Sequence, residues 1–244
     1  MISIVMPAHN EATYLEPAVK TVVEGLRDRG HQFEVIIAEN GSTDRTAIEL
    51  SALMDLYPEV SDIHLPVADY GAALRAGFLA ASGEIVVNFD VDFVDLAFLE
   101  DAIAHMRNPR TAVVVGSKRA PGALDKRGLF RRIVTSVFSL ILRTVFGLGV
   151  SDTHGIKALR RPVLEPLVAV CHFGQDVFDT ELILRAERAG LSVVETPVAV
   201  EEIRPARTPI WSRIPRSLVR LGQLRLMLWK ETRQGRSEGR GVIG

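Results

Sequence analysis

The sequence has little cysteine and no long apolar run. Cys171 is the single cysteine, so no disulfide can form within the chain, and we predict a protein of a reducing compartment. We give this thiol no role beyond that of a small buried hydrophobe. No apolar run approaches the roughly 20 residues that span a bilayer. The chain starts directly with strand-like residues 2–6, so we expect a cytoplasmic protein without a secretory leader.

An excess of charge of either sign is also absent. Lysine and arginine total 29 against 30 acidic residues, a formal net charge of -1, so we expect no nucleic-acid partner. The 244 residues are 47% hydrophobic, which is enough to bury a sizeable core. Basic residues gather near the C-terminus, where Glu231 is the one acid between Arg204 and Arg236.

Strand-like and helix-like segments alternate through the first half. We expect strands at 2–6, 33–38, 60–65, 84–89 and 112–117, and helices at about 14–29, 46–54, 71–81 and 97–106. This alternation predicts an α/β fold with a mostly parallel sheet and helices on both faces. Ligands of such sheets bind beyond the carboxyl ends of the strands.

The second half has a different texture. A basic, glycine-containing loop is expected at 118–132, followed by an amphipathic helix at 130–146. Further on we expect a turn and short strand at 152–161, a helix at 177–189, a late strand at 191–200 and a basic amphipathic helix near the C-terminus.

Three polar turns, at 7–11, 39–46 and 90–95, follow predicted strands and should gather at one edge of the sheet. The third begins with Asp90 and Asp92, which point to the same side of an extended chain. Two carboxylates suit Mg²⁺ or Mn²⁺, which complete their shells with water and phosphate. Asp-x-Asp alone is common in turns, and its position at the ligand edge favours a metal site. In the second turn Glu39 could accept hydrogen bonds from a nucleobase or a ribose; a solvated loop acid is the alternative.

The order of several motifs resembles a known family. PAHNE (7–11), ENGSTD (39–44), YGAALRAG (70–77) and NFDVD (88–92) occur in the order and spacing of family 2 glycosyltransferases of the GT-A fold. GSKR (116–119), DTHGIK (152–157) and ETP (195–197) are similar to the branch with dolichyl-phosphate mannose synthase and bacterial polyprenyl-phosphate glycosyltransferases. The resemblance covers 1–205, with 206–233 left as a basic helical extension and 234–244 as a tail expected to be disordered.

This resemblance implies a Rossmann-like GT-A domain and a nucleotide-diphospho-sugar donor. Asp90 and Asp92 would hold the metal on the diphosphate. The residues expected at the donor are Pro7, Ala8, Asn10, Glu11, Glu39, Gly71, Asp90 and Arg204. The family usually has two aspartates where this chain has Glu39 and Asn40, so the identity of the base stays open.

The nature of the acceptor decides which residues act in the reaction. A phosphate acceptor, which the branch implies, is already anionic and needs cations, for which the candidates are Lys118, Arg119, Arg131, Arg132 and Arg204. A hydroxyl acceptor needs a general base, and Asp179 or Glu181 could serve. The expected catalytic group is Asp92, Asp179, Lys118 and Arg132.

The resulting hypothesis is an inverting, metal-dependent transfer of a hexose from a GDP-mannose or UDP-glucose type of donor to a polyprenyl phosphate. The alternatives are a soluble phosphorylated or sugar acceptor, or a nucleotide-binding module without activity. The C-terminal basic helix would lie on the inner face of the cell membrane, and a homodimer seam is its alternative use.

Overall fold

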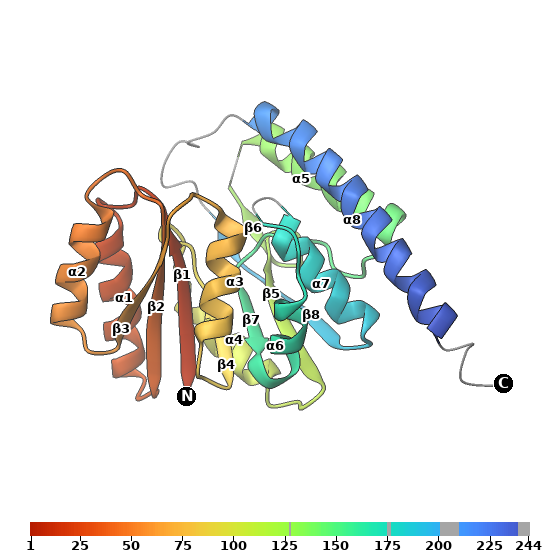
Figure 1. Ribbon diagram of the computed structural model, residues 1–244. Helices are drawn as coiled ribbons and strands as arrows, with labels where there is room; N and C mark the ends of the chain where they lie inside the picture. Colours follow the sequence, from red (N-terminus) through yellow and green to blue (C-terminus); the bar gives the residue numbers. More distant parts are fainter. Residues whose placement is uncertain (127, 175–176, 201–209, 239–244) are drawn as a thin grey trace. The chain divides into compact units, whose positions relative to one another are not determined.

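The computed structural model describes residues 1–126, 128–174, 177–200 and 210–238 (Figure 1). The chain divides into two compact units, Met1–Ile203 and Arg204–Gly244. Arg204, expected at the donor, lies outside the described residues, and so does the side chain of Arg131.

The first unit is built on a seven-stranded sheet with the strand order β3-β2-β1-β4-β7-β5-β8 (Figure 1). Its strands are β1 (Ile2–Ala8), β2 (Phe33–Asn40), β3 (Val60–Leu65), β4 (Ile85–Asn88), β5 (Thr111–Ser117), β7 (Lys157–Arg160) and β8 (Ser192–Pro197). All neighbours pair in parallel except β7, which runs antiparallel between β4 and β5. The predicted mostly parallel sheet is thus confirmed. Two short strands, β6 (Leu124–Asp125) and β9 (Ala199–Val200), pair beside it.

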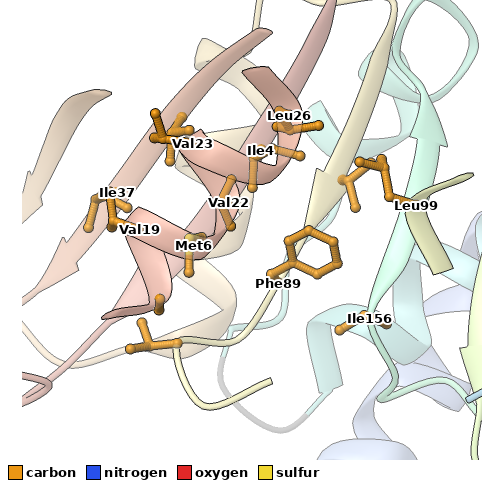
Figure 2. Close-up of a cluster of buried hydrophobic side chains, with 14 of the residues drawn as sticks. Ile4, Met6, Val19, Val22, Val23, Leu26, Ile37, Phe89, Leu99 and Ile156 are labelled. Atoms are coloured by element: carbon orange, nitrogen blue, oxygen red, sulfur yellow. The ribbon is translucent and has the colours of Figure 1, made fainter. Parts of the chain in front are cut away.

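Helices cover both faces of the sheet, as the alternation predicts (Figure 1). One face carries α1 (Leu15–Asp28), α2 (Thr46–Leu56) and α4 (Leu96–His105), and Figure 2 shows side chains of α1, α4 and the strands meeting in one apolar cluster. The other carries α3 (Tyr70–Ala80), α6 (Arg161–Ala169) and α7 (Phe178–Arg188). Every residue of β1 is buried because both of its faces are covered. Ile4 and Met6 face the cluster, whereas Val5 faces Gly77 of α3.

Helix α6 has no counterpart in the sequence-based expectations. It has nine residues and two prolines, Pro162 in the first turn and Pro166 inside the helix. Proline is tolerated in the first turn because the N–H group it lacks has no helical partner there. Two prolines in so short a segment hid the helical pattern. Strands β1 and β2 also extend through residues expected in turns, among them Pro7, Glu39 and Asn40.

Two amphipathic helices lie in the later part of the chain. Helix α5 (Leu129–Phe146) belongs to the first unit and begins one residue before its expected range. Helix α8 (Ile210–Glu238) belongs to the second unit and reaches five residues into the segment expected to be disordered. No helix in the described part of the chain is long and apolar enough to cross a membrane.

Cys171 follows α6 and is buried, with its thiol donating to the carbonyl oxygen of Leu167 at 3.2 Å. Burial, with a further contribution from the charge of Glu181, raises the pKa of the Cys171 thiol to about 12. The thiolate is the reactive form, so we expect Ellman's reagent to leave the folded protein unmodified while it labels the urea-unfolded chain fully. Labelling of the folded protein at a rate within tenfold of the unfolded rate would contradict this expectation.

Candidate active site

The turns after β1 and β2 are locked together, as their common edge predicts. The Asn10 side-chain oxygen accepts a hydrogen bond from the Thr43 N–H at 2.8 Å, and the Asn10 N–H donates to the Ser42 hydroxyl at 3.0 Å. The Glu11 N–H donates to the hydroxyl of Thr46 at 2.7 Å. Asn10 adopts a φ of 55°, which asparagine tolerates better than most residues. Asn10, expected at the donor, therefore also holds these two turns in place.

Glu39 lies at the end of β2 with 2% of its surface exposed, so its interpretation as a solvated loop acid is wrong. One carboxylate oxygen accepts from the Ser42 N–H at 2.6 Å, and the other lies 2.5 Å from Nδ1 of His64 at the end of β3. Burial alone would raise the pKa of Glu39, but the hydrogen bonds from Ser42 and the charge of His64 outweigh it and lower this pKa. No motif in the sequence pointed to His64.

The start of α3 links the second turn to the aspartate pair. The Asn40 side-chain oxygen accepts from the Asp69 N–H at 2.8 Å, and Asp69 caps α3 by accepting from the Ala72 N–H at 2.9 Å. The next residue, Tyr70, donates its hydroxyl to Oδ1 of Asp90 at 2.8 Å. Gly71, expected at the donor, is buried in this first turn of α3. The carboxyl ends of β1, β2 and β4 therefore form one connected edge.

Asp90 and Asp92 sit in a turn rather than in the extended chain that the sequence suggested. The Phe93 N–H donates to the carbonyl oxygen of Asp90 at 2.9 Å, and Val91 between the acids is buried in the core. The two carboxylates still interact, because Asp92 adds to the effect of burial in raising the pKa of Asp90 against the hydrogen bond from Tyr70. Burial and the charges of Asp90, Asp179 and Asp92 raise the pKa of Tyr70 well above its usual value. Tyr70 therefore stays a neutral donor.

This donor set fits a divalent ion that brings most of its own ligands. In the described part of the chain no three histidine, cysteine or acidic side chains are grouped closely enough to hold a metal. Two half-buried carboxylates that repel each other suit Mg²⁺ or Mn²⁺ completed by water and phosphate oxygens, and not a closed structural zinc site.

The later motifs meet at the carboxyl ends of β5 and β8. One Glu195 oxygen accepts from the N–H and hydroxyl of Ser151, at 2.9 and 2.6 Å, and from the Asp152 N–H at 3.2 Å. The Ser151 hydroxyl also lies 3.0 Å from that of Ser117. Asp152 is buried, which by itself would raise its pKa, but the charges of Lys118 and His154 and the hydrogen bonds from their backbone N–H groups together outweigh burial and lower the pKa of Asp152. Glu195 thus anchors the segment that carries DTHGIK beside GSKR.

A pocket of about 440 Å³ opens between the segment after β5 and the first turns of α5. Its polar lining is Lys118, Arg119, Asp125, Arg132 and Ser136, and its apolar lining includes Leu129 and Ile133. Arg119 donates to the Ser136 hydroxyl at 2.5 Å and is thereby fixed to α5. Three of the five candidate cations therefore line one pocket.

The two acids of α7 have different surroundings. Glu181 is fully buried; one of its oxygens accepts from the N–H groups of His172 and Phe173, both at 2.9 Å, and the other accepts from Arg185 at 2.9 Å. Asp179, 4% exposed, lies with Oδ1 3.0 Å from Nζ of Lys157. The Glu181 carboxylate is therefore fully used in holding the backbone and Arg185, and Asp179 stays the candidate of this pair for a role in the reaction.

Sequence reasoning missed Tyr70, Lys157, His64 and Glu195 as parts of this arrangement. Tyr70, Lys157 and Glu195 stand inside motifs that carried the family resemblance, which was the one available signal. His154, the histidine of DTHGIK, packs its ring edge-on against Phe138 with the ring centroids 5.2 Å apart.

A mostly parallel sheet with paired acids in the turn after β4 and a basic pocket beside β5 defines an α/β protein of the GT-A type. The sequence model of glycosyl transferase family 2 matches residues 3–168, and the chain belongs to this family of glycosyltransferases. The family expected from the motifs is thereby confirmed.

Similarity to individual relatives extends further along the chain. The chain is 33% identical to the glycosyltransferase AglD of Haloferax volcanii over 205 residues, and this alignment covers 81% of this chain and 32% of that protein. It is 30% identical over 247 residues to the dolichyl-phosphate beta-glucosyltransferase ALG5D of Trichomonas vaginalis, covering 93% of this chain and 75% of that one. The chain thus spans about a third of the first relative and three quarters of the second.

Solved structures share the fold. The mannosyltransferase PcManGT of Pyrobaculum calidifontis, in complex with GDP-Man and Mn²⁺, aligns with a TM-score of 0.60 and 23% identity over 88% of this chain and 60% of that one. Glucosyl-3-phosphoglycerate synthase of Mycobacterium tuberculosis, in complex with Mn²⁺ and UDP-glucose, aligns with a TM-score of 0.65 and 23% identity over 90% of this chain and 76% of that one.

Proposed function

We propose that the protein moves a hexose, with inversion, from a nucleotide-diphospho-sugar to a polyprenyl phosphate with the help of Mg²⁺ or Mn²⁺. The observation that carries the proposal is the position of Lys118. Burial raises the pKa of Asp90 in the acid pair, the charge of Lys118 partly offsets this rise, and the Lys118 side chain also lines the basic pocket. Lys118 therefore joins a site for a metal-bound diphosphate to a site for a second anion.

The donor would bind across the carboxyl ends of β1, β2 and β4. Asp90 and Asp92 would hold the divalent ion, which supplies stabilisation of the charge that develops on the departing nucleoside diphosphate. Glu39 is buried with a lowered pKa and is therefore an ionised acceptor for a ribose hydroxyl or a base N–H. Its contacts with Ser42 and His64 fix the direction of the carboxylate. GDP-Man and UDP-glucose in the two solved neighbours support a nucleotide sugar as donor.

The acceptor would place its phosphate in the pocket beside α5. A phosphate oxygen is already anionic near neutral pH and attacks without a strong base, so cations that bind and orient it are what the reaction needs. Lys118, Arg119 and Arg132 supply them. Leu129 and Ile133 in the same lining suit a phosphate attached to a hydrocarbon chain. Similarity to dolichyl-phosphate beta-glucosyltransferases favours the same acceptor class.

Asp179 would face the hexose from α7. With a phosphate acceptor, its carboxylate accepts a hydrogen bond from a sugar hydroxyl and orients the ring. With a hydroxyl acceptor, the same carboxylate would take the proton. The cations of the pocket favour the phosphate acceptor.

Arg132→Gln is expected to raise the KM for polyprenyl phosphate about tenfold and to leave the KM for the donor unchanged, because one charge-assisted hydrogen bond to the acceptor is lost. The measurement is release of nucleoside diphosphate from UDP-glucose or GDP-mannose with Mn²⁺ and a detergent-solubilised polyprenyl phosphate. Arg143→Gln on the same helix, outside the pocket lining, is the matched control.

Two results would count against the proposed function. A higher kcat/KM with 3-phosphoglycerate than with the lipid phosphate would establish a soluble acceptor. No release of nucleoside diphosphate from any nucleotide sugar would establish a module without activity.

Contact of α8 with the inner face of the membrane stays a prediction, as do the cytoplasmic location and the homodimer. Within α8, the Arg233 guanidinium lies over the ring of Trp229 at 3.8 Å from its centroid. An arginine stacked on an aromatic ring is compatible with the interface of an anionic bilayer.

A further inference from the structure

Lys157 is a charged residue with no exposed surface. It is the first residue of β7, the antiparallel strand between β4 and β5. Its ammonium group donates to the Gly155 carbonyl oxygen at 2.6 Å and lies 3.0 Å from Oδ1 of Asp179. Among the residues that the structure describes, no other lysine or arginine is buried to this degree. An ammonium group loses much solvation in such a place and persists only with close partners.

The neighbouring ion pair on α7 shows what a purely structural pair looks like. Glu181 accepts two backbone hydrogen bonds, from His172 and Phe173, in addition to that from Arg185, so its removal would release a turn of the chain. Asp179 Oδ1 accepts no hydrogen bond of good geometry, although the Lys157 ammonium lies at ion-pair distance. At 3.0 Å in a buried setting the two charges attract strongly whatever the angle between the groups. Lys157 is thus the charged contact that holds Asp179.

The pair lies at the site rather than beneath it. Lys157 is directly opposite Asn88 in the β4–β7 register, and Asn88 comes two residues before Asp90 in the chain. Tyr70 donates a hydrogen bond to Asp90, and the charge of Asp179 adds to the effect of burial in raising the pKa of the Tyr70 hydroxyl. Asp179 therefore belongs to one acidic group with Asp90 and Asp92, and Lys157 is the buried positive charge that contacts Asp179.

Stability alone gives little reason for this pair. Replacing a buried ion pair by apolar residues of similar volume is often neutral or stabilising. A carboxylate that must face a substrate in one orientation does need such a partner, since a displacement of about 1 Å can cost roughly a hundredfold in rate.

We propose that Lys157 is a positioning residue that fixes the Asp179 carboxylate within the acidic group, directed at the hexose of the donor. The inference rests on the proposed function, in which Asp179 contacts the sugar. Lys157 itself touches no substrate and acts through Asp179.

The experiment compares Lys157→Met, Asp179→Asn and the double variant with Arg185→Met, which breaks the other buried pair of α7. For each protein, kcat, the donor KM, the dissociation constant of the nucleoside diphosphate with Mn²⁺, and thermal unfolding are measured. Lys157→Met is expected to lower kcat about 100-fold and to keep nucleoside diphosphate binding within about threefold, because the acid pair is intact. In the Asp179→Asn background the same change is expected to alter kcat by less than about threefold.

The control separates positioning from general destabilisation. Arg185→Met is expected to lower the unfolding temperature while kcat stays within about twofold, since Glu181 holds backbone and not substrate. Equal loss of kcat in Arg185→Met, retained kcat in Lys157→Met, or losses that multiply in the double variant would each overturn the inference. If Lys157→Met does not fold, the double variant, which leaves no buried charge unmatched, is compared with Asp179→Asn, and a kcat lower by more than tenfold would again overturn it.

Failure of the proposed function has a different signature. It would show as a wild-type protein that does not transfer hexose to polyprenyl phosphate. The role of Lys157 is then read from the rate of donor hydrolysis without an acceptor, where the same pattern among the variants is expected and independent losses would again overturn it.

Discussion

Asp92→Asn is expected to lower hexose transfer about 1000-fold while the protein remains folded. The substitution removes a negative charge from the acid pair but keeps the size of the side chain. Asp92 is half-buried in the turn after β4, and its charge adds to the effect of burial in raising the pKa of Asp90, so the two carboxylates lie close enough to interact. Loss of that repulsion leaves the fold intact or slightly more stable. Transfer measured at saturating donor and Mn²⁺ is the test.

The matched control for this change is Asp95→Asn in the same segment. Asp95 caps α4 by accepting from the Phe98 N–H at 2.9 Å, and asparagine caps a helix about as well as aspartate. Asp95→Asn should therefore retain activity within about twofold. An Asp92→Asn protein with undiminished turnover would remove the basis for a metal at this edge.

The second large effect is expected from Gly155→Ala. A Cβ atom at Gly155 would lie 1.9 Å from the carbonyl oxygen of Gly116, an atom of the sheet backbone rather than a side chain that could move away. The Gly116 N–H donates to the Ile156 carbonyl oxygen at 2.8 Å, so β5 and this segment cannot separate without losing that bond. We expect a loss of about 3 kcal/mol or more. The temperature of thermal unfolding should fall by about 10 °C.

Gly128→Ala serves as the control for Gly155→Ala, because a Cβ atom there meets nothing within 4 Å. Gly128 precedes α5 with a φ of −55°, which alanine adopts without strain. Its unfolding temperature should stay within about 2 °C of the wild type. A Gly155→Ala protein as stable as the Gly128→Ala control would show that the two segments are less tightly packed than described.

The first half of the fold could be predicted because each element shows its own periodicity. The strand expected at 60–65 matches β3, and the helix expected at about 14–29 contains α1. The insertion of β7 between β4 and β5 could not be predicted, since a four-residue strand carries no signal of its neighbours. Helix α6 could not be predicted either, because two prolines fall within its nine residues.

The candidate site, too, could be predicted only in part. Asp90 and Asp92 were recognisable as candidates because two acids directly after an apolar strand are conspicuous in any sequence. Tyr70 and Lys157 were not, because their meaning depends on Asp90 and Asp179, which are 20 and 22 residues away along the chain. Asp179 and Glu181 were equivalent candidates until their partners were known. The backbone hydrogen bonds of Glu181 are a tertiary property that local pattern does not contain.

The most direct test of the central claim is the anomalous scattering of manganese in crystals soaked with Mn²⁺ and UDP-glucose or GDP-mannose. The account predicts one manganese peak within coordination distance, roughly 2.0–2.6 Å, of carboxylate oxygens of both Asp90 and Asp92 or of their bound waters, with the diphosphate oxygens on its other side. A manganese peak elsewhere, with both carboxylates directed away from the bound nucleotide, would contradict the account.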